Sequence, residues 1–225
     1  GKVGLEIGGK VIAARRQARH FMQPMAGKVI DRVFGLPGGV SKPLKQDMVD
    51  ELKRAAPGFV DFAAFSLQAF ADIVLKNQAY VDTILADHYA HRTNYMGTVD
   101  ANGKVNFYRG QLRVVEPTGK RMLQLEPDEY LAYIEEHVEP GAYIKFPFLK
   151  KIGWKGFVDG EDSGLYKATP LSRLNAADGM ATPLAQQEYD RMYDTLGGKP
   201  VNHTLATHWA RLVELLYATE RWVEL

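Results

Sequence analysis

Residues 172–221, near the C-terminal end of the chain, carry two helical patterns separated by a turn that is rich in glycine. Thr182-Pro183 predicts the start of the first helix, because threonine caps helices and proline fits their first turn. Gly197-Gly198 ends that helix, and Asn202 or Thr204 is the expected cap of the next. The apolar residues of the second helix recur at spacings of three, four and seven: Leu205, Trp209, Leu212, Leu216 and Val223. This spacing is typical of a helix that buries one face in a core.

Residues 1–92 are also expected to be helical. The first helical pattern runs from Ile7 to Met25. The face opposite its apolar positions is basic: Lys10, Arg15, Arg16, Arg19 and His20. A basic face of this kind is either solvated or a contact surface for an acidic partner, and both interpretations stay open.

A loop and a second helical region follow. The Pro-Gly-Gly of Phe34–Gly39 predicts a tight turn between helices. The next helix is expected to begin at Ser41 and to break at Pro57-Gly58. A long helical pattern then carries an apolar stripe: Phe59, Phe62, Phe70, Ile73, Val81 and Ile84. We interpret this stripe as core packing rather than a cofactor site, because nothing polar converges on it.

Residues 93–126 change to the alternating pattern of strands. Asn102-Gly103 is a hairpin signal between Tyr95–Val99 and Val105–Tyr108. Further turns, at residues 109–110 and 117–119, lead into strand patterns at 112–116 and 122–125. The sequence therefore predicts a small antiparallel meander of three or four strands.

Residues 127–170 are expected to hold one helix and a long irregular loop. Acidic residues favour a helix that starts near Glu126 and runs to about Val138, with the irregular segment from Gly141 to Pro170. Together with the helices in residues 171–225, this predicts a mainly α fold with a small β meander, of the α+β class. Residues 1–225 are expected to form a single segment of one domain.

Composition excludes several classes of function. With 225 residues and 46% hydrophobic residues, the chain is long and apolar enough to bury a core. Its net charge of +1 does not favour a nucleic-acid partner. Zero cysteine excludes disulfides and cysteine-ligated clusters within these residues. No apolar run approaches the length that spans a membrane and no signal peptide is evident, so we expect a cytoplasmic protein.

Two clusters are weighed as metal sites. His88 and His91 lie three apart, a spacing that suits two imidazole ligands on one helix face, but a third ligand is missing. Asp159, Glu161 and Asp162 are an acidic cluster that suits weak calcium or magnesium binding, or solvated loop acids. For both clusters the ordinary structural interpretation is the expected one.

Other residues with chemical potential are interpreted as structural. His203 and His208 are five apart and do not share a helix face, so they are poor joint ligands. Arg211 is expected to project inward and to pair with a carboxylate such as Asp178. The sequence contains no nucleophile elbow, no Walker loop and no dinucleotide fingerprint.

Four phrases, in order, resemble the large subunit of nickel–iron hydrogenases. They are FGLPGGVSKPL (34–44), YIKFPFLKKIGWKGFVDGEDSG (143–164), RLNAADGMATPLA (173–185) and HWARLVELLYATE (208–220). The resemblance is to the soluble enzymes that pass electrons to viologen, deazaflavin or nicotinamide acceptors. In that family a histidine-proline pair precedes the Pro-Gly-Gly loop, whereas Asp31-Arg32 stand there in this chain.

The resemblance implies a metal centre that these residues do not supply. In the family, two C-x-x-C pairs, one near each end of the subunit, hold nickel and iron, and this chain has no cysteine. Two explanations fit: a central fragment that lacks both cysteine pairs, or a cysteine-free relative of the kind found in respiratory complex I. A fragment is the favoured expectation, because the sequence starts at a glycine and ends inside a helical pattern.

The expected parent is therefore a nickel-dependent hydrogenase that oxidises or forms dihydrogen, with iron–sulfur clusters in a partner subunit. The expected partners are electron-transfer subunits and the hydrogenase small subunit. This segment is expected to be scaffold, inactive by itself, without catalytic, cofactor-binding or metal-ligating residues. The alternative is a metal-free protein with a structural or quinone-site role.

Overall fold

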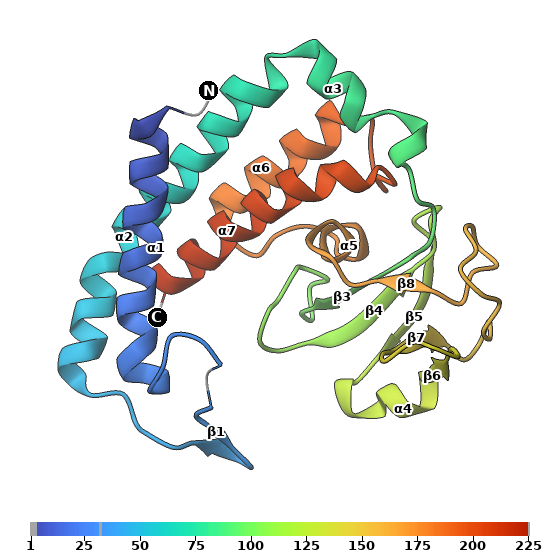
Figure 1. The fold of residues 1–225 in the computed structure, drawn as a ribbon, viewed down its shortest axis with the longest axis horizontal. Coiled ribbons are helices and arrows are strands. Elements are labelled where there is room, and N and C mark those ends of the chain that lie inside the picture. Colours follow the sequence, from blue (N-terminus) through green and yellow to red (C-terminus); the bar gives the residue numbers. More distant parts are fainter. Residues whose placement is uncertain (1–3, 32, 225) are drawn as a thin grey trace. The chain divides into compact units, whose positions relative to one another are not determined.

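A computed structural model describes residues 4–31 and 33–224, and the chain divides into two compact units. The first unit comprises residues 1–69 and 218–225, and the second comprises residues 70–217. Helices alternate with three small sheets along the chain, so the α+β class is confirmed (Figure 1). Whether both units belong to one domain, as the sequence suggests, stays a prediction.

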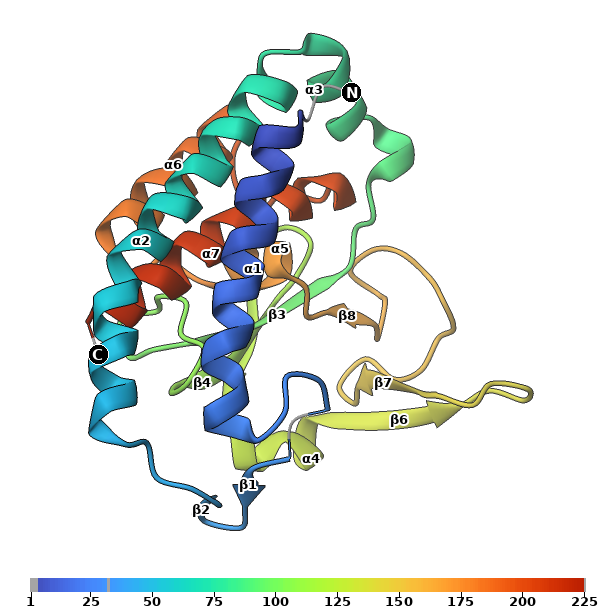
Figure 2. The ribbon, with the colours of Figure 1, turned by 60° about the vertical axis from the view of Figure 1, so that its left-hand side comes forward.

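The first unit is built from two long helices that lie side by side (Figure 1 and Figure 2). Helix α1, Leu5–Ala26, is the predicted first helix, and it ends at Gly27, whose φ of 75° is left-handed. Helix α2, Gln46–Phe70, follows a two-residue ribbon of β1, Gly35–Leu36, and β2, Gly39–Val40. The predicted turn in this loop is confirmed, with Gly38 at a φ of 83°. Asp31 has a positive φ of 50°, whereas Arg32 lies outside the described residues.

The predicted break at Pro57-Gly58 is wrong, because α2 runs through both residues. Its buried residues, Ala56, Phe59, Ala63 and Leu67, form one face on both sides of the proline. Packing of that face outweighs the single backbone hydrogen bond that proline removes. The core of this unit includes Phe59 and Trp222, whose ring centroids are 4.7 Å apart.

The long pattern that was predicted to reach Ile84 is divided into several elements. A π-helical turn, Ala71–Leu75, follows α2, and helix α3, Gln78–Ile84, begins after Asn77. Residues 46–75 are long and apolar enough to cross a membrane by length and composition alone, which the sequence reasoning did not expect. A core helix passes the same test, so this single stretch is weak evidence for a membrane.

The second unit contains a four-stranded sheet in the order β5-β4-β3-β8. The predicted antiparallel meander is formed by β3, Asn94–Val99, β4, Gln111–Val115, and β5, Arg121–Leu125. Strand β8, Tyr166–Lys167, adds to β3 in parallel. It lies in the segment that was expected to be irregular, so that expectation is wrong there.

The hairpin partner of the first strand was predicted wrongly. Residues 105–108 are not a strand, because the Asn106 side chain accepts from the backbone N–H groups of Tyr108 and Arg109 at 2.8 and 2.7 Å. These bonds close a local turn. Val105 makes only isolated bridges, to Val99 and Met180, and β4 takes its place beside β3.

The helix predicted to reach Val138 is also wrong. A capping box of Glu126 and Glu129 starts a 3-10 turn, Pro127–Glu129, and helix α4 covers only Tyr130–Tyr133. Strand β6, Ile134–Val138, then pairs with β7, Lys145–Leu149. The β-branched ends of β6 and the phenylalanines of β7 favour this ribbon over a longer helix.

Two helices and residues 207–217 of a third complete the second unit. Helix α5, Pro170–Ala176, is capped by the Thr169 hydroxyl, and α6, Pro183–Thr195, starts as predicted. Helix α7, Thr207–Val223, follows a 3-10 turn, Thr204–Ala206, whose N-cap is His203. The predicted caps, Asn202 and Thr204, are therefore wrong. Of the expected core positions, Trp209 and Leu216 are buried, whereas Val223 is exposed.

Gly97 allows α5 to lie directly on β3. A Cβ atom there would come within 2.8 Å of the Arg173 Cα atom, closer than real Cβ contacts. We expect Gly97→Ala to lower the free energy of unfolding by about 1–3 kcal/mol, measured by urea unfolding. Gly58→Ala in α2 is the control, because a Cβ there meets nothing within 4 Å, and it should be neutral or slightly stabilising. Equal effects of the two substitutions would contradict this packing.

Candidate functional site

The phrase RLNAADG folds into α5 and the loop after it, and it forms the centre of a buried polar network in the second unit. Asn175, 1% exposed, donates from Nδ2 to the carbonyl oxygen of Val201 at 2.8 Å. Its Oδ1 accepts from the Tyr193 hydroxyl at 2.8 Å and from the Val201 N–H at 3.2 Å. One amide thereby ties α5 to α6 and to the segment that precedes α7.

Lys199 extends the network toward the surface. Lys199 is exposed when the whole residue is considered. Its Nζ atom, however, donates to the Ala177 carbonyl and, at 2.8 Å, to the Tyr189 hydroxyl. The Tyr189 hydroxyl in turn donates to the carbonyl of Ala177 at 3.1 Å. These contacts satisfy the carbonyls at the end of α5, which the helix itself leaves without partners.

Asp178 is held by the sheet and not by α7. Arg113 of β4, with a side chain 5% exposed, donates to Asp178 Oδ2 at 2.9 Å and to the Ala176 carbonyl at 3.2 Å. The predicted Arg211–Asp178 pair is therefore wrong, and Arg211 is exposed. Arg121 of β5 also lies 3.9 Å from Asp178 Oδ2. Both arginines come from strands that are distant from Asp178 in sequence, and nothing in the local pattern of these strands indicates the pairing.

A second ion pair joins two of the phrases that carry the family resemblance. Arg173 of α5 donates from Nε and Nη2 to the two carboxylate oxygens of Glu214 in α7, at 2.6 and 2.7 Å. The Glu214 side chain is 7% exposed and that of Arg173 is 30% exposed. This bidentate pair fixes α7 against α5 with the geometry that arginine and carboxylate prefer. Sequence reasoning missed it, although both residues stand in the phrases that resemble the family.

Burial changes the pKa values of this unit. It lowers the pKa of Lys199 to about 8, although the Asp178 carboxylate opposes the change. It also lowers the pKa of Lys167 to about 8, with Asp159 opposing. Burial raises the pKa of the Tyr189 and Tyr95 hydroxyls.

We expect the free energy of unfolding to rise between about pH 8 and pH 10. In that interval the unfolded chain keeps lysine protons, because the ordinary pKa is 10.5, whereas folded Lys199 and Lys167 have released theirs. Above pH 10 the sign reverses, since unfolded tyrosines lose protons that folded Tyr189 keeps. Urea midpoints from pH 7 to 11 measure this curve. Lys199→Met should flatten the rise and the exposed Lys120→Met should not, so identical curves for both would contradict the assignment.

The histidines and acids weighed as metal ligands do not gather around one point, although His91 and Asp159 form a pair. His88 lies in a 3-10 turn, Asp87–Tyr89, against the Tyr89 ring, whereas His91 pairs with Asp159 at 2.7 Å between Nε2 and Oδ1. Asp162 lies 3.9 Å from Lys155 Nζ. Within residues 4–31 and 33–224, no three His, Cys, Asp or Glu side chains come together in a way that could hold a metal ion.

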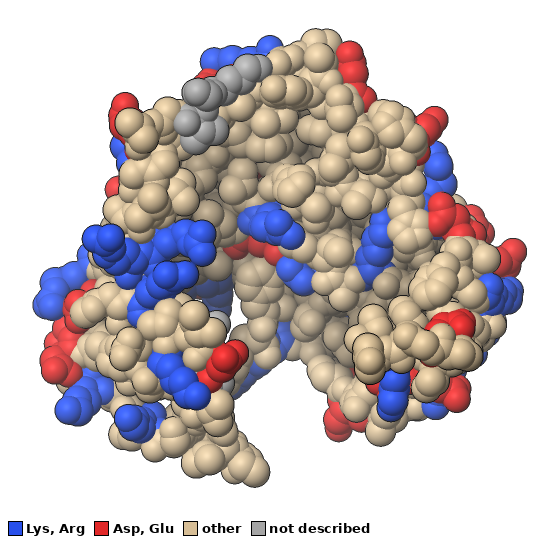
Figure 3. Space-filling model, viewed as in Figure 1, with Lys and Arg blue, Asp and Glu red and all other residues tan. Residues whose placement is uncertain are grey.

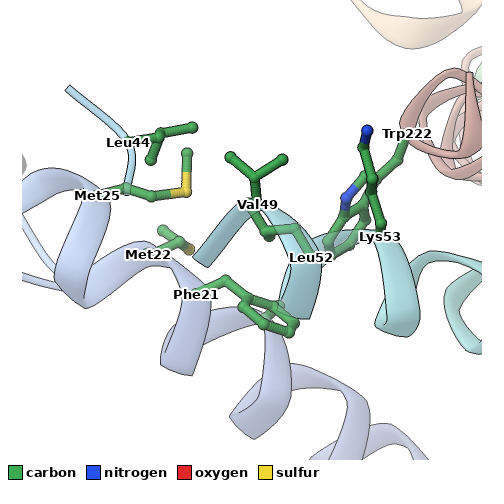
Figure 4. A pocket seen from close by; sticks show the side chains of 9 residues that line it. Phe21, Met22, Met25, Leu44, Val49, Leu52, Lys53 and Trp222 are labelled. Atoms are coloured by element: carbon green, nitrogen blue, oxygen red, sulfur yellow. The ribbon is translucent and has the colours of Figure 1, made fainter. Parts of the chain in front are cut away.

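An apolar cavity of about 550 Å³ lies in the first unit. Figure 4 shows α1 residues across from α2 residues, with Lys53 and Trp222 at one side. The cavity is lined by Ala18, Phe21, Met22, Met25, Leu44, Val49, Leu52, Lys53 and Trp222. Sequence reasoning did not predict it, because helical spacing shows which faces are apolar but not whether they are fully covered. The cavity lacks the convergent polar groups of a catalytic site.

Comparisons with known proteins point to one class of enzyme. No family model matches the chain. It is 42% identical over 224 residues to an iron-sulfur subunit of the F420-non-reducing hydrogenase of Archaeoglobus profundus, a match that covers 100% of this chain and 46% of the relative. It is 37% identical to a vhu subunit of the F420-non-reducing hydrogenase of Methanococcus voltae, over 98% of this chain and 49% of the relative.

Two further similarities involve NAD-reducing enzymes. The chain is 30% identical to the NAD-reducing hydrogenase HoxS subunit beta of Cupriavidus necator, over 94% of this chain and 42% of the relative. A crystal structure of NAD+-reducing [NiFe]-hydrogenase in the H2-reduced state matches with a TM-score of 0.81 and 28% identity, over 97% of this chain and 46% of that chain. The chain thus spans about half the length of the relatives it matches. The relatives that it matches are subunits of hydrogenases.

Proposed function

We propose that this chain is the central part of the large subunit of a nickel–iron hydrogenase, in which it serves as scaffold. The observation that carries the proposal is the fold match to a [NiFe]-hydrogenase over 97% of the chain, together with hydrogenase relatives that match over nearly the whole chain. The parent enzyme would oxidise or form dihydrogen. Its electrons would leave through iron–sulfur clusters of a partner subunit.

The residues of this chain do not fit a nickel–iron centre. Such a centre requires soft thiolate ligands, and the chain contains no cysteine. We therefore assign no step of hydrogen chemistry to these residues. Their role is structural: the hydrogen bonds of Asn175 and the Arg173–Glu214 pair hold α5, α6 and α7 in place as part of the scaffold of the subunit.

The exposed apolar side chains of the first unit support the proposal that this unit is covered by other parts of a longer subunit or by other subunits. Many large apolar residues there are exposed: Leu5, Val11, Ile12, Ile30, Val33, Leu36, Val40 and Leu44. Apolar surface of this extent usually marks an interaction surface. Within a longer subunit, and beside other subunits, these side chains would be buried.

The proposal is tested by expressing the whole coding region that contains these residues, together with its neighbouring genes. We expect dihydrogen-dependent reduction of a viologen dye by the purified complex and none by the 225-residue chain on its own. Activity of the complex that survives loss of all its cysteine pairs would contradict the proposal. A complex without dye reduction and without bound nickel would favour the metal-free alternative.

A further inference from the structure

Helix α1 presents a basic face that the rest of the first unit leaves open. It consists of Ile12, Arg15, Arg16 and Arg19, which we call the arginine face. These positions are separated by three, four and seven residues, so they lie on one side of the helix. Phe21, on another side of α1, is buried in the core. Basic side chains gather over α1 in the view of Figure 3.

The charges of the arginine face are not neutralised within the described part of the chain. Arg15, Arg16 and Arg19 form no ion pair with any residue that the structure describes, whereas Lys10 of the same helix pairs with Glu6 at 3.1 Å. Like charges three and four residues apart destabilise a helix. Ile12 and the three arginines line a hollow of about 350 Å³, and Ile12 is 61% exposed.

These features fit a carboxylate-rich protein surface. Arginine binds carboxylates through two parallel hydrogen bonds and is enriched at protein interfaces. An exposed isoleucine among the three arginines adds apolar contact, which a free anion would not use. A nucleic-acid partner is disfavoured, because this cluster of three arginines occupies one helix of a chain whose net charge is only +1.

We propose that the arginine face docks an acidic surface of another subunit of the same hydrogenase. This inference rests on the proposed function, since the relatives are named as subunits of hydrogenases. The pairing would orient the partner and speed its association, and it would weaken as salt is added.

The first test places a photo-crosslinking amino acid, p-benzoylphenylalanine, at position 12 of the subunit in the assembled hydrogenase. We expect a cross-link to another subunit, mapped by mass spectrometry to a segment rich in Asp and Glu. A cross-link only to the same subunit, or to a segment without acidic residues, would overturn the proposal. Nickel content and dye reduction are measured on the same sample, so a failure of the proposed function is seen separately.

The second test reverses the charges. Arg15→Glu, Arg16→Glu and Arg19→Glu together should weaken association of the purified subunits by about tenfold or more at low salt and reduce its salt dependence. The control triple, Arg109→Glu, Lys120→Glu and Lys151→Glu, changes the net charge equally at exposed positions of the second unit. It should alter association less than about twofold. Equal effects of the two triples, or no effect of the first, would overturn the proposal.

A glutamine version separates docking from folding. Arg15→Gln, Arg16→Gln and Arg19→Gln remove the charges without adding acids, and glutamine is a good helix former. We expect the circular dichroism of this variant to be unchanged and its association with the partner subunit to weaken less than in the glutamate triple. Unchanged association at low salt would overturn the proposal even if the glutamate triple failed to fold.

Discussion

Arg173→Ala should be among the most destabilising single substitutions in this chain. It removes the partner of Glu214, whose side chain is 7% exposed, and leaves a buried carboxylate without its two charge-assisted hydrogen bonds. Breaking one side of such a pair costs about 3–5 kcal/mol. In a protein of this size that corresponds to a fall in melting temperature on the order of 10 °C. Thermal and urea unfolding of the 225-residue chain measure both quantities.

Two further variants serve as controls for the expected loss of stability in Arg173→Ala. Arg211→Ala, on the exposed side of α7, should change stability by less than about 0.5 kcal/mol. Replacing both partners, with Arg173→Met and Glu214→Leu, should restore most of the loss, because no uncompensated charge remains. A cost below about 1 kcal/mol for Arg173→Ala would mean that the pair does not hold α7 against α5.

Asn175→Ala is expected to have a comparable effect for a different reason. The substitution takes the Asn175 partner from three buried groups: the Tyr193 hydroxyl, the Val201 N–H and the Val201 carbonyl, which keeps only a longer bond of 3.4 Å from the Tyr95 hydroxyl. Each unsatisfied buried group costs about 1–3 kcal/mol, so a total of about 3 kcal/mol or more is expected in urea unfolding.

Tyr193→Phe is the graded comparison for the Asn175 substitution. It removes one hydroxyl, while Asn175 keeps both of its bonds to Val201. We expect a cost of about 1 kcal/mol. If Tyr193→Phe cost as much as Asn175→Ala, the amide would not be the centre of the network.

The spacing of apolar residues predicted helices correctly where one helix face is buried. Prediction failed where tertiary packing outweighed a local signal such as a proline or a run of acidic residues. Helix α1 and the start of α6 lie where the spacing of apolar residues and the Thr182-Pro183 pair place them. Pro57 was interpreted as a break, but the buried face of α2 continues through it. Ile134–Val138 was interpreted as helix, although its preference for a strand depends on the phenylalanines of β7, which are distant in sequence.

Most of the polar network could not be predicted from the sequence, because the residues that pair are far apart along the chain. Arg113 and Asp178 are 65 residues apart, and Arg173 and Glu214 are 41 residues apart. A single sequence shows which residues are charged but not which strand or helix brings them together. The resemblance phrases marked the right segments, residues 173–185 and 208–220, yet the expected partner of Asp178 was the wrong arginine.

The central proposal is tested most directly by sequencing the source gene on both sides of these 225 codons. If the chain is the middle of a metal-bearing large subunit, one pair of the form C-x-x-C will be encoded upstream and another downstream, as a thiolate-ligated centre requires. A complete reading frame around these codons that encodes neither pair would contradict the proposal. The protein would then be a metal-free relative, and its function would have to be sought in binding.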